Sequence, residues 1–229
     1  MRGDSIVVES HHQRAAEGVH ALLRQRWAGQ LQRCVISVAG ESGAGKSEVA
    51  EALGRCIDPT RGSVLVMQQD DYFVHPPISN DAVRRSDIGW VGPGEVRLSL
   101  MDTHLRAFRD RETVLMPMVR YQEDRIDEEE VDLSTFEFVI AEGTYVSLLQ
   151  EIDIRVFITR DFHATRAHRE KRRRHASELD PFIDRVLEIE HEIIAAHRAR
   201  ADILIHEDYS VSWAGESPEP SDDSGTVTP

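Results

Sequence analysis

The sequence predicts an α/β fold in which helices cover both faces of a doubly wound parallel sheet of about five strands. The first observation is a series of short runs of β-branched and other apolar residues at positions 34–39, 64–67, 113–116, 138–141, 154–158 and 203–205. The second is that helical stretches separate most of these runs. Strands that are apolar on both faces are typical of a parallel sheet buried between two helical layers.

The length of 229 residues suits one such domain with short additions. Residues 1–32 are expected to form an N-terminal helical extension, because Ala15, Val19 and Leu23 recur at helical spacing. The main domain is expected to span 33–212. A late helix is predicted to begin at Asp180-Pro181, with the carboxylate as N-cap and the proline in the first turn. Residues 213–229 are acidic and rich in proline and serine, and are expected to be a disordered tail.

The composition excludes some classes of partner. A formal net charge of -14 argues against general binding of nucleic acid, whose phosphates would be repelled. No apolar run approaches the roughly 20 residues of a membrane span, so no membrane partner is expected. Cys34 and Cys56 lie in segments that read as core, which favours two reduced thiols and a cytoplasmic location. Assembly with further copies of the chain stays open.

Residues 40–47 match the phosphate-binding pattern G-x-x-x-x-G-K-[ST] in full, directly after an apolar run and directly before a helical stretch. This is the context of a P-loop, and it makes the predicted fold of the P-loop NTPase type. Lys46 is expected to reach the β and γ phosphates of a nucleotide, and Ser47 to offer its hydroxyl to Mg²⁺. The other residues expected to hold the nucleotide are Gly40, Ser42, Gly43, Ala44 and Gly45. The motif alone leaves GTPases, ATPases, motor proteins and kinases open.

A cluster of polar and aromatic residues follows the second apolar run at positions 68–73. In a doubly wound sheet the carboxyl ends of the strands face the ligand crevice. A carboxylate at this edge could accept the proton of a hydroxyl that attacks the γ phosphate, and Asp70 is the candidate for this base. The structural alternative is an acidic turn with Tyr72 and Phe73 tucked into the core.

Glu142 directly follows the run at 138–141 and so is also expected at the carboxyl end of a strand. Its carboxylate could hold Mg²⁺ through water or orient an acceptor. A strand-end glutamate without a ligand is the alternative.

Basic residues gather at 166–174 in an otherwise acidic chain. Arg166, Arg169 and Arg173 are three and four positions apart and would share one face of a helix, which suits a lid that closes over a transferring phosphoryl group. A solvated basic face or a nucleic-acid patch is the alternative.

Taken in order along the chain, these motifs resemble those of the uridine kinase and phosphoribulokinase family of P-loop kinases, and of nicotinamide riboside kinase within that wider group. The resemblance covers roughly residues 33–210. Its shared segments are the P-loop, residues 69–73, Pro117 ahead of Tyr121 and Arg125, residues 139–143, and the arginine-rich lid.

The resemblance implies a phosphotransferase that uses ATP and Mg²⁺ and acts on a hydroxyl of a nucleoside, riboside or sugar. It puts the general base on Asp70, places Ser47, Asp70 and Glu142 around the metal, and makes Lys46 and Arg169 catalytic. Arg166 and Arg173 would contact phosphate. The residues that it places around the acceptor are Asp71, Tyr72, Phe73, Tyr121 and Arg125.

Two segments depart from the uridine kinase pattern. Residues 90–93 read Trp-Val-Gly-Pro, with Val91 in place of the aspartate that holds the ribose hydroxyls in that family, and the segment at 119–125 has no histidine. These departures argue against uridine as acceptor. A nucleotide-dependent regulatory protein without an acceptor is the alternative function. The acceptor, the preference for ATP over GTP and the oligomeric state stay open.

Overall fold

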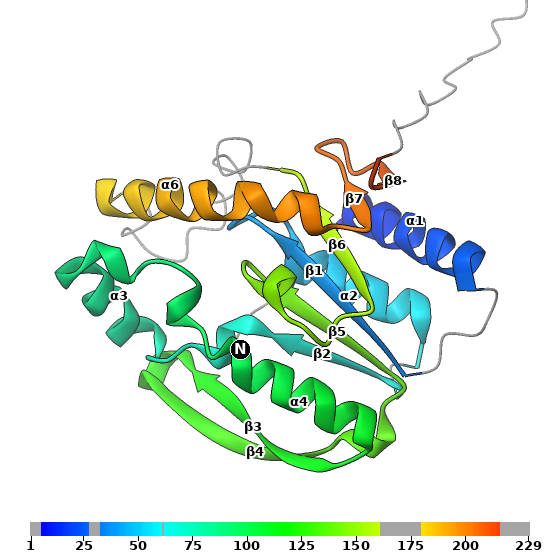
Figure 1. Cartoon of the computed structure of the whole chain (residues 1–229), viewed down its shortest axis with the longest axis horizontal. Coiled ribbons are helices and arrows are strands. Elements are labelled where there is room, and N and C mark those ends of the chain that lie inside the picture. Colours follow the sequence, from blue (N-terminus) through cyan, green and yellow to red (C-terminus); the bar gives the residue numbers. More distant parts are fainter. Residues whose placement is uncertain (1–5, 28–32, 61, 161–179, 216–229) are drawn as a thin grey trace, which may run out of the picture.

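The computed structural model describes residues 6–27, 33–60, 62–160 and 180–215 (Figure 1). Within these residues, six strands form the main sheet in the order β2-β5-β1-β6-β7-β8. The strands are β1 (Cys34–Gly40), β2 (Val64–Gln68), β5 (Phe138–Gly143), β6 (Ile154–Ile158), β7 (Ile203–Ile205) and β8 (Val211–Trp213). The first five are parallel, as the sequence predicts, and β8 pairs antiparallel with β7.

Two expectations about the sheet were wrong. It has six strands rather than five, because the chain turns back after β7 and adds β8 at the edge. The apolar run at 113–116 is not part of it. That run begins β3 (Thr113–Arg120), which pairs only with β4 (Arg125–Asp132) in a separate antiparallel sheet. A short connection can join antiparallel strands, whereas parallel strands need a long crossover.

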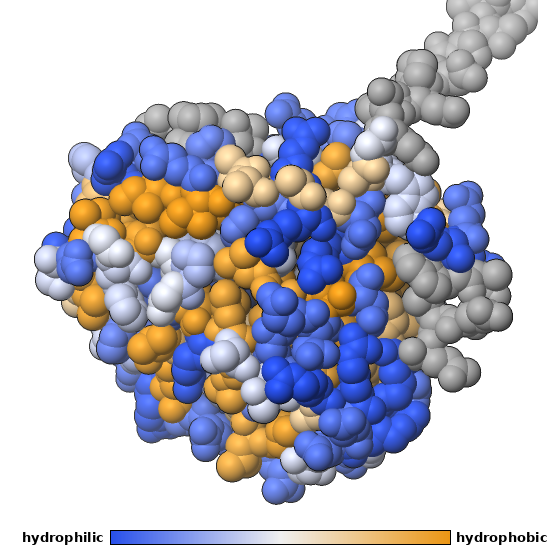
Figure 2. Space-filling model, viewed as in Figure 1, coloured by the Kyte–Doolittle hydropathy of each residue, from blue (hydrophilic) through white to orange (hydrophobic). Residues whose placement is uncertain are grey.

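Alternating residues of β1 supply both halves of the core. Val35 and Ala39 face one side, against α4 (Leu98–Asp110) and α6 (Pro181–Ala195). Ile36 and Val38 face the other side, against α1 (Ser10–Trp27) and α2 (Lys46–Ile57). Figure 1 shows α1 beside β6–β8 and α4 across the sheet from it. In the space-filling view, hydrophilic residues cover the outer side of α4, as expected of an amphipathic helix (Figure 2).

The predicted helices at both ends of the domain are present. In α1, Ala15, Val19 and Leu23 are fully buried. The N-terminus of α6 has the predicted cap, in which the Asp180 side chain accepts a hydrogen bond from the Phe182 N–H at 2.9 Å. This bond satisfies one of the N–H groups that the first turn of a helix leaves without a partner.

The tip of the β3–β4 hairpin is fastened to α3 (Pro77–Ser86). Asp124, in the left-handed conformation at the turn, accepts hydrogen bonds from the Ile78 N–H at 2.7 Å and from the Ser79 N–H and hydroxyl at 3.1 and 2.6 Å. It therefore caps the N-terminus of α3 from another part of the chain. The carboxylate also lies at the positive end of the helix dipole.

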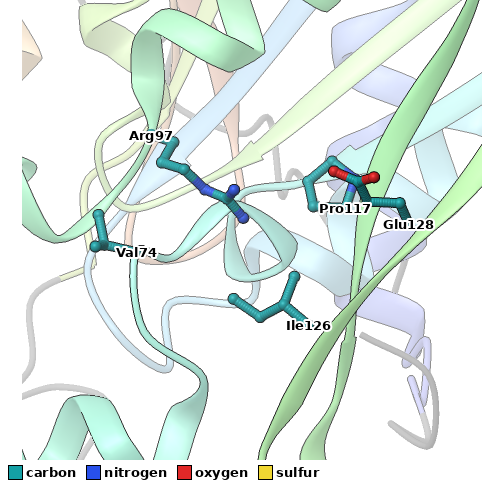
Figure 3. A pocket seen from close by; sticks show the side chains of 5 residues that line it. All are labelled: Val74, Arg97, Pro117, Ile126 and Glu128. Atoms are coloured by element: carbon teal, nitrogen blue, oxygen red, sulfur yellow. The ribbon is translucent and has the colours of Figure 1, made fainter.

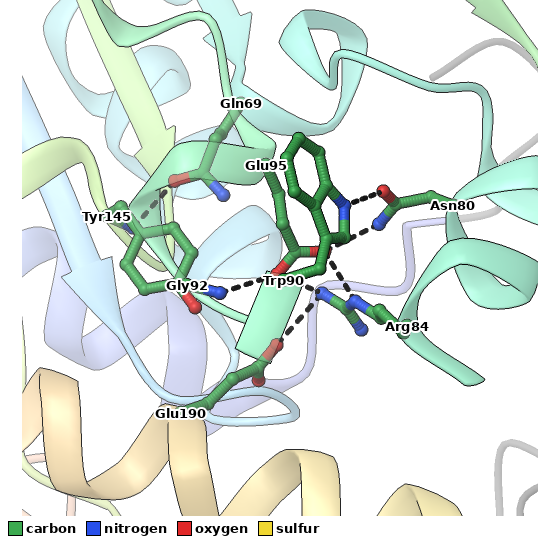
Figure 4. A network of polar contacts seen from close by, with 8 residues as sticks. All are labelled: Gln69, Asn80, Arg84, Trp90, Gly92, Glu95, Tyr145 and Glu190. Atoms are coloured by element: carbon green, nitrogen blue, oxygen red, sulfur yellow. Dashed lines mark hydrogen bonds and ion pairs between the residues drawn. The ribbon is translucent and has the colours of Figure 1, made fainter. Parts of the chain in front are cut away.

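A buried ionic network joins α3, α6 and the loop before α4 (Figure 4). Arg84 of α3 contacts the fully buried Glu95 at 2.5 Å and Glu190 of α6 at 3.2 Å. Asn80 and the Gly92 N–H also donate to Glu95, at 2.6 and 2.8 Å. The donors to the central carboxylate come from α3 and from the loop before α4, and Arg84 also pairs with Glu190, which links α6 to the body.

Candidate functional site

The P-loop lies between β1 and α2 as predicted. Gly43 and Gly45 have φ angles of 78° and 94°, which side chains rarely adopt. A Cβ at Gly45 would also come within 2.9 Å of the His12 ring of α1. The amide end of α2 therefore points into the loop, as an anion site requires.

Further contacts hold the loop in place. The Lys46 ammonium donates to the Glu41 carbonyl at 2.9 Å, so it lies over the loop. The Glu41 carboxylate is buried and lies 2.8 Å from His191 Nδ1 of α6. The sequence offered no signal for this contact, because the two residues are 150 positions apart.

Glu142 lies beside the P-loop at the carboxyl end of β5. The strand pairs with β1 on one side and β2 on the other, so Glu142 stands opposite Val38 and Gln68. Its Oε1 accepts a hydrogen bond from the Ser47 hydroxyl at 3.0 Å. Burial, and then the nearby charge of Asp70, raise the pKa of Glu142 from 4.5 to about 7, against the opposing effect of Lys46.

The group is suited to a small divalent cation. Two carboxylates, Asp70 and Glu142, interact electrostatically beside the Ser47 hydroxyl, and such hard oxygen donors are the ligands that Mg²⁺ prefers. A cation here would offset both the burial and the charge of Asp70 that raise the pKa of Glu142. The described residues contain no cluster of three or more histidine, cysteine or carboxylate side chains that could hold a metal by themselves. Magnesium in kinases characteristically shares its ligands with the nucleotide phosphates.

Gln69 and Gly143 fit together at the same edge of the sheet. Gln69 is buried, and its Oε1 accepts a hydrogen bond from the Tyr145 N–H at 2.6 Å. Gly143 has a φ of 157°, and a Cβ there would lie 2.3 Å from the Gln69 Cβ. The glycine is needed because the strand and the turn after β2 approach so closely.

The two aspartates after β2 have different environments. Asp70 is exposed, whereas Asp71 is only 9% exposed and accepts a hydrogen bond from the Val119 N–H of β3 at 2.8 Å. Asp71, predicted to contact the acceptor, thus anchors the hairpin to the turn after β2. Asp70 keeps an accessible carboxylate near Glu142 and Lys46.

Of the aromatic pair, Tyr72 lies in the core. It is fully buried and its hydroxyl lies 2.8 Å from His104 Nδ1. This is the structural alternative considered for the motif, and it leaves Tyr72 no surface on an acceptor pocket. Phe73 is half-buried against the same core and bridges to Val96.

The structure does not bring Tyr121 and Arg125 towards the P-loop residues. Both lie at the exposed tip of the hairpin, where Arg125 is paired with Asp127 at 2.6 Å and with Glu123 at 3.0 Å. Arg166, Arg169 and Arg173, predicted to form the lid, fall outside the described residues.

A pocket of about 430 Å³ opens between the turn after β2, the start of α4 and the hairpin (Figure 3). Its lining is Val74, Arg97, Pro117, Ile126 and Glu128. Of these, only Pro117 belongs to a segment that carries the sequence resemblance. Neither Arg97 nor Glu128 stands out in the sequence, because each is a single charge in a stretch with many.

Comparisons with known proteins agree with this geometry. The model of the "Phosphoribulokinase / Uridine kinase family" matches residues 35–190. The chain is 27% identical over 183 residues to a uridine kinase of Listeria innocua, covering 76% of this chain and 86% of that one. It is 28% identical over 202 residues to a bifunctional alpha-galactosidase/sucrose kinase of Mediterraneibacter gnavus, covering 82% of this chain but only 22% of that protein.

Among solved structures, phosphoribulokinase from Rhodobacter spheroides is similar in fold, with a TM-score of 0.55 at 14% identity over 76% of this chain and 70% of that one. In the part of the chain that the structure describes, no helix is both long and apolar enough to cross a membrane.

Proposed function

Because the chain belongs to the phosphoribulokinase/uridine kinase family, we propose that it transfers the γ-phosphoryl group of ATP to a hydroxyl of a small molecule in the cytoplasm. The observation that carries the proposal is the meeting of three features at one edge of the sheet. These are the P-loop, the Ser47–Glu142 hydrogen bond, and the accessible carboxylate of Asp70 close enough to raise the pKa of Glu142.

In this proposal the P-loop amides and Lys46 bind the nucleotide phosphates. Ser47 and Glu142 hold Mg²⁺, directly or through water, with Asp70 nearby. The ion supplies charge neutralisation for the transferring group when it is bound. Glu142 then stays ionised at neutral pH, because a cation stabilises the form that burial disfavours.

Asp70 acts as the general base that takes the proton of the attacking hydroxyl. It has this role rather than Asp71 because its carboxylate is exposed, whereas that of Asp71 holds the Val119 N–H. Arg169, with Arg166 and Arg173, neutralises charge on the phosphoryl group from the lid.

The proposed acceptor is a sugar or another small hydroxylated molecule rather than uridine. The relatives are named as kinases of uridine and of sucrose, so the family supports small hydroxylated acceptors. Val91 is buried and carries no group for ribose hydroxyls. Its neighbour Trp90 donates to Asn80 within the ionic network at 2.9 Å.

The test is a phosphorylation screen of the purified chain with Mg·ATP and Mg·GTP across nucleosides, ribosides and sugars, read by mass spectrometry of the products. We expect ADP formation that depends on one acceptor class and is lost in Lys46→Ala. Nucleotide hydrolysis that no acceptor stimulates would instead support the alternative, a nucleotide-binding regulatory protein.

A further inference from the structure

The pocket in Figure 3 is built onto the turn that carries Asp70. Its two body-side residues flank an antiparallel bridge, in which the Arg97 N–H donates to the Tyr72 carbonyl and the Val74 N–H donates to the Glu95 carbonyl, both at 2.8 Å. The hairpin supplies the opposite wall, Pro117, Ile126 and Glu128. A volume of about 430 Å³ falls in the range of small-ligand sites, about 300–1,000 Å³.

Arg97 brings a positive charge to this pocket. Its guanidinium points into the space between the two walls (Figure 3). Two of its nitrogens, Nε and Nη2, are enclosed and have no hydrogen-bond partner among the described residues. Nor does Arg97 make an ion pair with any described carboxylate. Enclosed polar atoms normally have a hydrogen-bond partner, because leaving one without a partner costs about 1–3 kcal/mol.

His104 and Tyr72, the two side chains on which the charge of Arg97 acts, do not supply an anion. Burial, and then the charge of Arg97, lower the pKa of His104, so this ring is neutral at pH 7. Burial raises the pKa of Tyr72, and the two neutral side chains bond to each other. Glu128 is exposed on the opposite wall of the pocket and makes no ion pair with Arg97.

We propose that Arg97 binds a carboxylate or phosphate group of the acceptor, so that the substrate is a hydroxylated compound with one acidic group. This rests on the proposed function and narrows its acceptor class. A guanidinium offers a planar fork of donors that matches both anions. The apolar residues Val74, Pro117 and Ile126 contact the carbon skeleton, and the exposed Glu128 disfavours compounds with further negative charge.

The distance between the pocket at Arg97 and the carboxylate of Asp70 is short enough for a small molecule to span. Asp70 and Val74 are four residues apart, which even in an extended chain spans at most about 14 Å. Part of that stretch, Gln69–Tyr72, is a 3-10 turn and is shorter still. An acceptor anchored at Arg97 can therefore place a hydroxyl beside Asp70.

The experiment compares neutral sugars and ribosides, sugar phosphates, and hydroxylated carboxylic acids as acceptors for the wild type, Arg97→Gln, Glu128→Gln and Arg106→Gln. Arg106 is the control, since it is an exposed arginine of α4 paired with Glu151. For an anionic acceptor, Arg97→Gln should raise its KM roughly 10- to 100-fold, the usual worth of a charge-assisted hydrogen bond. The KM for ATP should not change, and Glu128→Gln should lower the acceptor KM.

Folding provides an independent readout. Arg97→Gln removes two enclosed nitrogens that no described residue hydrogen-bonds, so its melting temperature should equal or exceed that of the wild type. A fall of several degrees would make Arg97 structural and overturn the inference. Preference for neutral acceptors, or a higher acceptor KM in Glu128→Gln, would overturn it too.

Failure of the proposed kinase function can be distinguished from failure of the anion site at Arg97. If no acceptor in any class is phosphorylated, the three compound sets are tested as ligands by thermal shift in saturating Mg·ADP, which fills the P-loop. Stabilisation by the sugar phosphates or the carboxylic acids that Arg97→Gln loses and Arg106→Gln retains supports an anion site without transfer. If neither acidic compound set stabilises the protein in this way, the anion site itself is overturned. Comparison of the two acidic sets shows whether phosphate or carboxylate is bound.

Discussion

Replacement of Glu142 by glutamine should make the metal-free protein more stable at neutral pH. The variant keeps the oxygen that accepts the Ser47 hydroxyl but cannot ionise. In the wild type, burial and Asp70 raise the pKa of Glu142 from 4.5 to about 7. Ionising this carboxyl therefore costs more in the folded chain than in the unfolded one.

The sign and size of the effect follow from linkage. A raised folded-state pKa contributes stability that is complete below pH 4.5 and is lost as the pH rises to about 7. One pKa unit is worth about 1.4 kcal/mol, so the whole loss is about 3 kcal/mol. Glu142→Gln does not undergo this loss, because its side chain cannot ionise. Its free energy of unfolding should exceed that of the wild type by about 1 kcal/mol near pH 5.5 and by about 3 kcal/mol near pH 8. For a chain of this length the larger figure corresponds to roughly 6–12 °C in melting temperature.

The assay is thermal or urea unfolding of both proteins in EDTA across this pH range, with Glu188→Gln as an exposed carboxylate control. Adding Mg·ADP should then reverse the order, because the wild type gains a metal ligand that the variant lacks. A stability difference that does not change with pH would refute the buried, proton-binding Glu142. Equal stabilisation of both proteins by Mg·ADP would refute its role at the metal.

Four further substitutions test the proposed roles. Lys46→Ala should nearly abolish phosphoryl transfer with an unchanged melting temperature, and activity within a few-fold of wild type would contradict the P-loop assignment. Asp70→Asn should lower kcat by roughly 10²–10⁴-fold with normal nucleotide binding. Asp71→Ala should instead lower the free energy of unfolding by about 1–3 kcal/mol, because it leaves the Val119 N–H unsatisfied. A larger loss of turnover in the Asp71 variant than in the Asp70 variant would assign the general base to Asp71. Arg169→Ala should lower turnover more than nucleotide affinity, and normal turnover with loss of nucleic-acid binding would favour a basic patch instead.

The parallel sheet could be predicted because its signal is local. Each of its first five strands is a short apolar run, and both faces of β1 are buried, with Ser37 as its one polar side chain. The error at 113–116 arose because β3 has the same composition, while its partner β4 reads Arg-Ile-Asp-Glu-Glu-Glu-Val-Asp. A strand so rich in charge is not recognisable without its neighbour.

The candidate site was predictable where a motif fixes the backbone. The P-loop, Glu142 and Asp70 follow directly from strand ends, which meet at one edge of any parallel sheet. Arg97 could not be found in this way, because its significance depends on the lack of a partner in three dimensions. The environment of Tyr72 likewise depends on His104, 32 residues away.

Asp124 makes the β3–β4 hairpin and helix α3 a single mechanical unit. The hairpin carries one wall of the pocket, and its tip holds the first turn of α3 through Ile78 and Ser79. Any movement that narrows or widens the pocket at the hairpin therefore also displaces the start of α3. Amide hydrogen exchange at Ile78 and Ser79 thus becomes a remote reporter of pocket closure, since these N–H groups remain protected only while the hairpin and the helix move together.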